Sequence, residues 1–320
     1  MDAVKDAIHA LGLDAPKVKP VIWCVYHRDA YTTARHLEEA LRARPDFTVY
    51  GIGPGHPHQD GQRINLLAWT RHLPAPSLVL LMDGASIVEP IGIESFGCPV
   101  AYYAIDTHLN AERGPWIYQV DHVYLAHRRT LGVWKVKSSS HLPVAADSLV
   151  HRLIPHLPVV YDIAFVGGVD LAEVHWGRRE ALKRLASSYK VLACRTTGAW
   201  MSFAYSKSKL VFNQSVKHDV NMRVFEAMAC QRVLVTDHSE ELEQMGLKDG
   251  EHCLMFRTAD ELMEKVAWAL SHDEERETIA QAGFQWFKAA HTYDHRAQRI
   301  VDDMSVLSGE KANGGRAAKG

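Results

Sequence analysis

The segment from Asn221 to Cys230 combines residue types that can bind a nucleotide. Its pattern predicts a helix that begins near Asn221, whose side-chain oxygen can cap the first turn. The N-terminus of a helix presents free N–H groups and a partial positive charge, which suit a phosphate. Arg223 can add a charge-assisted contact to that phosphate, and Glu226, on the same helical surface, can hold a ribose diol. The alternative is a capped amphipathic helix in which Arg223 and Glu226 form an ion pair.

Further candidate side chains follow predicted strands elsewhere in the chain. Ligands of open α/β sheets bind at the carboxyl ends of the strands, so polar residues at these ends can meet in one cleft. Histidine titrates near neutral pH and a carboxylate can take up a proton, which makes such residues candidates for acid–base catalysis or acceptor binding. The sequence does not rank these candidates, which are His27, Asp106, His108 and His218. For Asp106 and His108 the alternative is structural, with an aspartate that caps a turn and a histidine on the surface.

A second set of residues can contribute to phosphate binding. Gly167 and Gly168 follow a predicted strand, and without Cβ atoms they allow a tight turn and a close backbone approach to a phosphate. They lack the full G-x-G-x-x-G spacing, so an ordinary turn is the alternative interpretation. Arg178, on the following helix, and Lys217, in a polar loop, can each add positive charge. For both of these side chains, plain exposure to solvent is the alternative.

Composition excludes several classes of protein. The chain has 320 residues, which suits two domains, and 47% of them are hydrophobic. A net charge of −2 provides no overall basic field for nucleic acid or an anionic membrane surface. No apolar run is long enough to span a membrane, and the N-terminus lacks a signal-peptide core. The five scattered cysteines form no C-x-x-C pair, which predicts free thiols in the cytoplasm.

The alternation of strand-like and helix-like segments predicts two doubly wound parallel sheets. Short continuous apolar runs suit strands that are buried on both faces. The predicted strands of the first sheet are residues 21–26, 47–51, 78–82, 99–104, 122–126 and 140–142, and those of the second are 162–166, 191–194, 210–213, 233–236 and 253–256. The predicted helices are residues 29–43, 178–187, 200–208, 221–230, 259–270, 274–290 and 294–307.

The prolines in residues 153–158 predict the boundary between the two domains, because proline disfavours helices and central strands. We therefore expect an N-terminal domain over residues 1–157 and a second domain over residues 158–290. A closing helix over residues 291–307 follows. Residues 308–320 contain no apolar side chain larger than alanine, which predicts a disordered tail.

The helix at Asn221 and the segments around it resemble group-1 glycosyltransferases, which have the GT-B fold. Within that group they are most similar to the CgeB-like branch, named for a spore-maturation protein. The resemblance covers roughly residues 160–300, and the N-terminal half matches more loosely, chiefly at residues 104–108. Its motifs are residues 162–168, 210–213, 219–226, 250–252, 260–262, 272–276 and 291–296.

The resemblance implies two Rossmann-like domains that face each other across a cleft, with the acceptor on the first and the donor on the second. The closing helix is then expected to cross back onto the first domain. Glu226 matches a carboxylate near the donor ribose, and the segment Asn221-Met222-Arg223 matches residues near the diphosphate. The implied activity is transfer of a sugar from a nucleotide-sugar donor to an unidentified acceptor, which can be a glycan, a protein or a small molecule.

One departure from the family pattern bears on the mechanism. Many group-1 enzymes carry two glutamates separated by seven residues, and Glu226 corresponds to the second. His218, beside Asp219, occupies the place of the first. The alternative function is therefore a non-catalytic protein with this fold, which binds a nucleotide sugar or a glycan or serves as a partner in an assembly. No Asp-x-Asp follows a strand, so the sequence predicts neither a metal nor a further cofactor.

Overall fold

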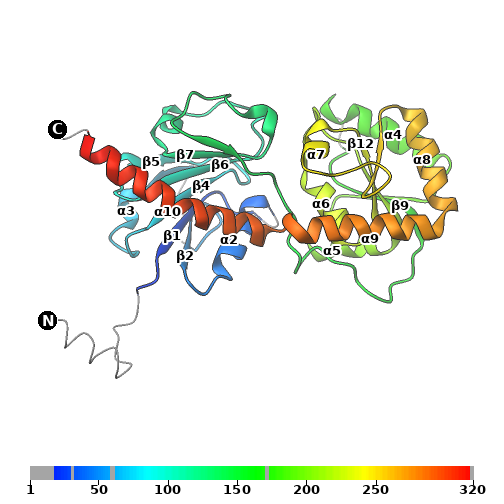
Figure 1. Cartoon of the computed structure of the whole chain (residues 1–320), viewed down its shortest axis with the longest axis horizontal. Helices are drawn as coiled ribbons and strands as arrows, with labels where there is room; N and C mark the ends of the chain where they lie inside the picture. The colour runs from blue at the N-terminus through cyan, green and yellow to red at the C-terminus, as the bar shows by residue number, and fades with distance from the viewer. Residues whose placement is uncertain (1–17, 30–31, 58–61, 170–172, 318–320) are drawn as a thin grey trace, which may run out of the picture.

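The computed structural model describes residues 18–29, 32–57, 62–169 and 173–317, which form two α/β domains side by side (Figure 1). Each domain is built on one parallel sheet with helices against its faces. This is the predicted fold class. Among the described residues, no helix is both long enough and apolar enough to cross a membrane.

The sheet of the first domain has six strands in the order β2-β1-β4-β6-β7-β8, and all its neighbours are parallel. Beside it lie a two-stranded sheet of β3 and β5 and a short helix, α3, which the sequence did not predict. The elements are β1 (Val21–Val25), α2 (Thr33–Arg42), β2 (Thr48–Ile52), β3 (Arg63–Asn65), α3 (Leu66–Trp69), β4 (Leu78–Met82), β5 (Glu89–Ile91), β6 (Val100–Ala104), β7 (His122–Leu125) and β8 (Ser139–His141).

Strand β1 shows why its apolar run is continuous. Its residues alternate between two cores: Ile22 and Cys24 pack on the α2 side, and Trp23 and Val25 pack on the opposite face. A strand covered on both faces needs apolar side chains at every position, whereas a half-exposed strand alternates. Helix α2 contributes one apolar stripe, consisting of Ala34, Leu37 and Leu41.

The sheet of the second domain has five parallel strands in the order β10-β9-β11-β12-β13. The predicted strands and helices are present here with small shifts at their ends, and α7 is an addition. The elements are β9 (Tyr161–Val166), α4 (Trp176–Ala186), β10 (Val191–Cys194), α5 (Ala199–Ser206), β11 (Ser208–Asn213), α6 (Met222–Ala229), β12 (Val233–Asp237), α7 (Glu240–Gln244), β13 (Leu254–Phe256), α8 (Ala259–Ser271) and α9 (Asp273–Ala290).

The last helix, α10 (Tyr293–Ala317), leaves the second domain and runs along the first, beside α2 (Figure 1). Arg296 fixes its start, because its guanidinium donates to the carbonyl oxygens of Pro143 at 2.6 Å and Val144 at 3.1 Å. Tyr124 donates to Asp303 further along, at 3.0 Å.

The prediction of disorder from residue 308 needs correction, because α10 continues to Ala317. Helix propagation adds one hydrogen bond per residue once the first turns have formed, so a helix that is held by packing can extend beyond its apolar part. Residues 318–320 and 1–17 lie outside the described residues.

Candidate active site in the interdomain cleft

Two cavities meet at the N-terminus of α6. The first, of about 270 Å³, lies between the domains, and is lined by Thr32, Thr33, Asp83, Gly84, Ile105, Asp106, His127, Val144, Asp219, Val220, Asn221 and Met222. The second, of about 230 Å³, is lined by His151, Val166, Gly167, Thr196, Thr197, Gly198, Met201, Asn221, Met222, Arg223 and Glu226. Asn221 and Met222 border both, so one ligand can extend from the second cavity into the cleft. We call these the cleft cavity and the α6 cavity.

The cavities lie where parallel α/β sheets bind ligands. Strand order reverses between β1 and β4 in the first sheet and between β9 and β11 in the second. Ligands bind in the crevice that such a reversal opens at the carboxyl ends of the strands. Asp83 follows β4, Gly167 follows β9, and α6 follows β11, so the two crevices face each other across the cleft.

The start of α6 differs from the prediction in one respect. Asn221 stands at the N-cap position with an extended backbone, but its side chain makes no capping hydrogen bond. Its Nδ2 instead donates to Oδ1 of Asp219 at 3.4 Å. The first N–H groups of α6 therefore lack a side-chain cap, at a point where the helix dipole is positive and both cavities are open.

Arg223 is fixed by the ends of two strands. Its Nε donates to the carbonyl oxygen of Val166 at 2.7 Å, and Nη1 donates to Oδ1 of Asn213 at 2.5 Å. The guanidinium also lies over the ring of Phe165, at 4.6 Å from its centroid. It forms no ion pair with Glu226, which rules out that alternative. Among the described residues Nη2 has no hydrogen-bond partner, so it can bind an anion in the α6 cavity.

Glu226 lies buried on the wall of the α6 cavity. Burial raises the pKa of this carboxyl to about 7, although Arg223 and His36 oppose the shift. The carboxyl therefore changes its charge near neutral pH, a property typical of functional sites. As a carboxylate it can accept hydrogen bonds from two hydroxyls.

The other residues predicted to bind phosphate, which include Gly167, Arg178 and Lys217, lie in different surroundings. Gly167 lies directly under Nη2 of Arg223, where a Cβ atom would not fit. The prediction that Arg178 contacts a phosphate needs correction. Its side chain is 6% exposed and donates to the carbonyl oxygens of Gly168 and Gln214 at 2.9 and 2.8 Å, so it joins two loops. It is not among the residues that line either cavity. Lys217 is exposed, with a left-handed φ of 51°.

Asp106 opens onto solvent at the edge of the cleft cavity. Desolvation by the surrounding protein, together with the carboxylates of Asp83 and Asp219, raises the pKa of Asp106 to about 6. Asp83 is itself buried, and accepts hydrogen bonds from the backbone of Ile105 at 2.8 Å and from Arg113 at 2.9 Å. It thereby fixes the loop that carries Asp106. A carboxyl with this pKa is largely ionised at neutral pH and can still accept a proton.

The candidate histidines occupy three different environments. The ring of His108 packs on that of His127 at 4.3 Å, and neither nitrogen of His108 has a hydrogen-bond partner among the described residues. Burial and the neighbouring His127 lower the pKa of His108 to about 4, so it is neutral at pH 7. Nδ1 of His27 pairs with Oγ of Ser86 at 2.7 Å. His218 is exposed, and lines a further hollow with Arg128 and Glu241. Neither His27 nor His218 lines the cleft cavity.

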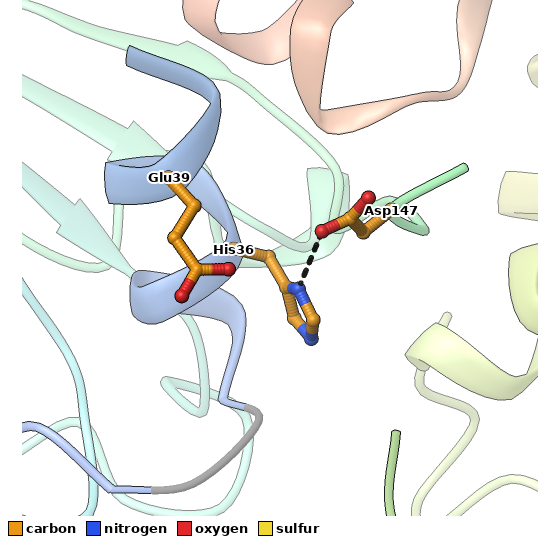
Figure 2. Close-up of side chains that lie close together, drawn as sticks. All are labelled: His36, Glu39 and Asp147. Carbon is orange, nitrogen blue, oxygen red and sulfur yellow. Dashed lines mark hydrogen bonds and ion pairs between the residues drawn. The ribbon is translucent and has the colours of Figure 1, made fainter. Parts of the chain in front are cut away.

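One group of described side chains has the composition of a metal site. Ligand atoms of His36, Glu39 and Asp147 lie within 4.8 Å of one another (Figure 2). Arg35 donates to the Glu39 carboxylate at 2.8 Å, and Nδ1 of His36 lies 3.1 Å from Oδ2 of Asp147. Because these groups already pair with one another and with arginine, we interpret the cluster as a polar link between α2 and the interdomain segment.

The sequence analysis missed three titratable residues on the cavity walls, Asp83, His127 and His151. Asp83 follows β4 and His127 follows β7, so the rule that selected Asp106 after β6 would also have found them. His151 lies in the segment between the domains and belongs to no motif. Only the folded chain brings it to Glu226.

Two Rossmann-like domains facing across a cleft define the class: this is the GT-B fold. The structure is similar to sucrose-phosphate synthase from Thermosynechococcus elongatus, at 13% identity and a TM-score of 0.59 over 92% of this chain and 100% of that chain. It is also similar to HepE of Anabaena in complex with UDP and glucose, at 12% identity and a TM-score of 0.60 over 90% and 100%. A glycosyltransferase from Rickettsia africae gives 9% identity and a TM-score of 0.61 over 90% and 98%.

The family comparison concerns the second domain. Residues 149–302 match the model of a family described as glycosyl transferase-like. The structural neighbours therefore show the GT-B fold, and the family match is confined to residues 149–302. No curated protein matches the chain.

Proposed function

We propose that this chain transfers a sugar from a nucleoside-diphosphate sugar to an acceptor hydroxyl, without a metal, as a CgeB-like glycosyltransferase of the cytoplasm. The observation that carries the proposal is the position of the uncapped α6 N-terminus, which borders both cavities. A diphosphate placed there meets backbone N–H groups and Nη2 of Arg223, while the nucleoside occupies the α6 cavity. HepE, which shares the fold, is a complex with UDP and glucose, and this supports a nucleotide-sugar donor.

The donor contacts divide among the residues of the second domain. Gly167 has no Cβ atom, which leaves room for Nη2 of Arg223, so the guanidinium can lie close to the strand end and face the diphosphate. The carboxylate of Glu226 accepts hydrogen bonds from the ribose. Arg178 acts indirectly, since it holds the loop of Gly168 against the loop after β11. Lys217 adds positive charge near the diphosphate from its exposed loop.

The sugar then extends into the cleft cavity, where the first domain presents Asp106. As the acceptor oxygen forms its bond to the anomeric carbon, the bond from that carbon to the diphosphate oxygen breaks. The proton of the acceptor hydroxyl passes to the Asp106 carboxylate, whose pKa of about 6 lets it take up a proton. The N-terminus of α6 and Arg223 stabilise the charge of the leaving diphosphate.

A binding and turnover experiment tests this function. Thermal unfolding is measured with UDP, GDP, ADP and their glucose conjugates, because a ligand at about 100 times its Kd stabilises a protein by about 2.7 kcal/mol. The expected result is stabilisation by one nucleotide series, followed by slow release of its diphosphate in the presence of acceptors. Binding without any turnover would favour the non-catalytic alternative, for which the missing first glutamate is the argument. Absence of binding to every nucleotide would refute the proposal.

A further inference from the structure

The segment between the domains places His151 against Glu226. His151 is 1% exposed and lines the α6 cavity together with Glu226. The closest pair of their polar atoms, Nε2 of His151 and Oε1 of Glu226, is 4.0 Å apart. This distance is longer than a hydrogen bond, so the two groups lie side by side on the cavity wall without bonding to each other.

The protonation of His151 follows from its other nitrogen. The backbone N–H of Asp147 donates to Nδ1 of His151 at 3.0 Å. An N–H group can only donate, so Nδ1 is an acceptor and the proton of the neutral ring resides on Nε2. Burial and the neighbouring His36 lower the pKa of His151 to about 3, which keeps the ring neutral. The α6 cavity is therefore bordered by an N–H donor from the linking segment and, above pH 7, by a carboxylate acceptor from α6.

The position of His151 is rigid. The backbone on either side of it bonds to α5, since Oγ of Ser202 donates to the carbonyl oxygen of Val150 at 2.9 Å and the backbone N–H of Ile154 donates to Ser206 at 2.9 Å. The ring of His36 packs edge-on against that of His151 at 5.0 Å. Figure 2 shows His36 reaching from α2 toward Asp147. A donor held in this way loses little freedom when a ligand binds.

We propose that His151 and Glu226 together bind one hydroxyl of the donor ribose, which accepts the Nε2–H of His151 and donates to the Glu226 carboxylate. A hydroxyl is the group that fits, because it is at once a donor and an acceptor. This assignment rests on the proposed function and adds a residue that lies outside the family motifs. His151 is thus a specificity residue supplied by the interdomain segment.

The test uses two substitutions that distinguish the roles of the two ring nitrogens of His151. His151→Asn keeps a polar atom for the Asp147 N–H and removes the donor at the position of Nε2, whereas His151→Gln keeps a donor near Nε2. Calorimetry measures the affinities of UDP, 2′-deoxy-UDP and 3′-deoxy-UDP for the full chain and both variants. We expect the full chain to prefer UDP over one deoxy analogue by at least about tenfold, because the missing hydroxyl would lose its hydrogen bonds to both His151 and Glu226. The preference should shrink severalfold in His151→Asn and persist in His151→Gln.

The outcomes are distinguishable. An equal loss of affinity for all three ligands in His151→Asn would mean that His151 only supports the fold, and would overturn the inference alone. UDP-glucose is measured as a fourth ligand, and a loss confined to it would assign the hydroxyl to the transferred sugar and would also overturn the inference. Failure of the unaltered chain to bind any nucleotide would refute the proposed function and this inference with it. If His151→Asn does not fold, a crystal structure with UDP decides, since a ribose oxygen within about 3.2 Å of Nε2 supports the pair and a longer distance refutes it.

Discussion

Gly167 lies directly beneath the guanidinium of Arg223, with Nη2 in the space that a Cβ atom at residue 167 would occupy. The same guanidinium is fixed by the carbonyl oxygen of Val166 and by Asn213. The glycine and the arginine therefore form one unit at the carboxyl ends of β9 and β11. This unit connects the turn predicted to approach a phosphate with the side chain predicted to bind it.

Gly167→Ala should weaken nucleotide binding by displacing Arg223. We expect UDP affinity to fall by about 1.5–3 kcal/mol, the usual value of a charge-assisted hydrogen bond, and uridine affinity to change little. Gly168→Ala is the matched control, because a Cβ there would lie 3.1 Å from the ring of His175, which leaves Arg223 in place. Calorimetry with both ligands measures the effect. If Gly167→Ala and Arg223→Ala lower UDP affinity additively in the double variant, the two residues do not act as one unit.

Glu226→Gln should lower the affinity for UDP by about 1.5–3 kcal/mol, because an amide replaces a carboxylate that accepts hydrogen bonds from the ribose. The side chains have nearly the same size, so the core beneath α6 should stay intact. Glu264→Gln, on the exposed face of α8, makes the same chemical change away from the site. Equal UDP affinity in the two variants would remove the ribose contact from Glu226.

Raising the pH should lower the free energy of unfolding and strengthen the binding of UDP-glucose. The pKa of Glu226 is raised in the folded chain to about 7 from an ordinary value of 4.5, so the stability it contributes is fully present below pH 4.5 and is lost as pH rises through 7. Binding of UDP-glucose needs the carboxylate, and should strengthen about tenfold between pH 6 and 8. Denaturant unfolding and calorimetry, each compared with Glu226→Gln, isolate this group. A binding constant that does not change with pH would contradict the assignment.

Asp106→Asn should reduce transfer far more than donor binding. Asp106 lines the cleft cavity but is absent from the walls of the α6 cavity, so in the proposed mechanism it meets the reacting groups and not the nucleotide. Loss of a catalytic base typically lowers kcat by about 100- to 10,000-fold. Steady-state kinetics and UDP calorimetry on the same preparation measure the two effects. A variant with normal kcat would move the role to another group, with His127 next on the cavity wall.

Turnover should survive excess EDTA. In the proposed mechanism the charge of the diphosphate is met by the α6 N-terminus and Arg223, which are present without an ion. Product formation is measured after chelation, with and without added magnesium or manganese. Complete loss on chelation that metal restores would defeat the mechanism, and would direct attention to Asp106 and Asp219, which both line the cleft cavity.

Most of the fold could be predicted from local patterns. Strands such as β4 and β10 begin and end at the predicted residues, because their apolar runs are bounded by residues that interrupt regular structure. The exceptions are short elements such as β3, β5 and α7, of three to five residues, whose segments are too short to show a period. The end of α10 was also wrong, since propagation from packed turns does not depend on the composition of the tail.

Local sequence features predicted the type of site, since Arg223 and Glu226 lie on one helix and two glycines follow a strand. The contacts of each side chain depend on the packing of the whole chain. Arg178 became a buried link between loops because its carbonyl partners come from a distant loop. His151 came to face Glu226 because the interdomain segment passes α6. Hydrogen bonds and pKa values depend on what surrounds a group in space, and residues distant in the sequence supply most of those surroundings.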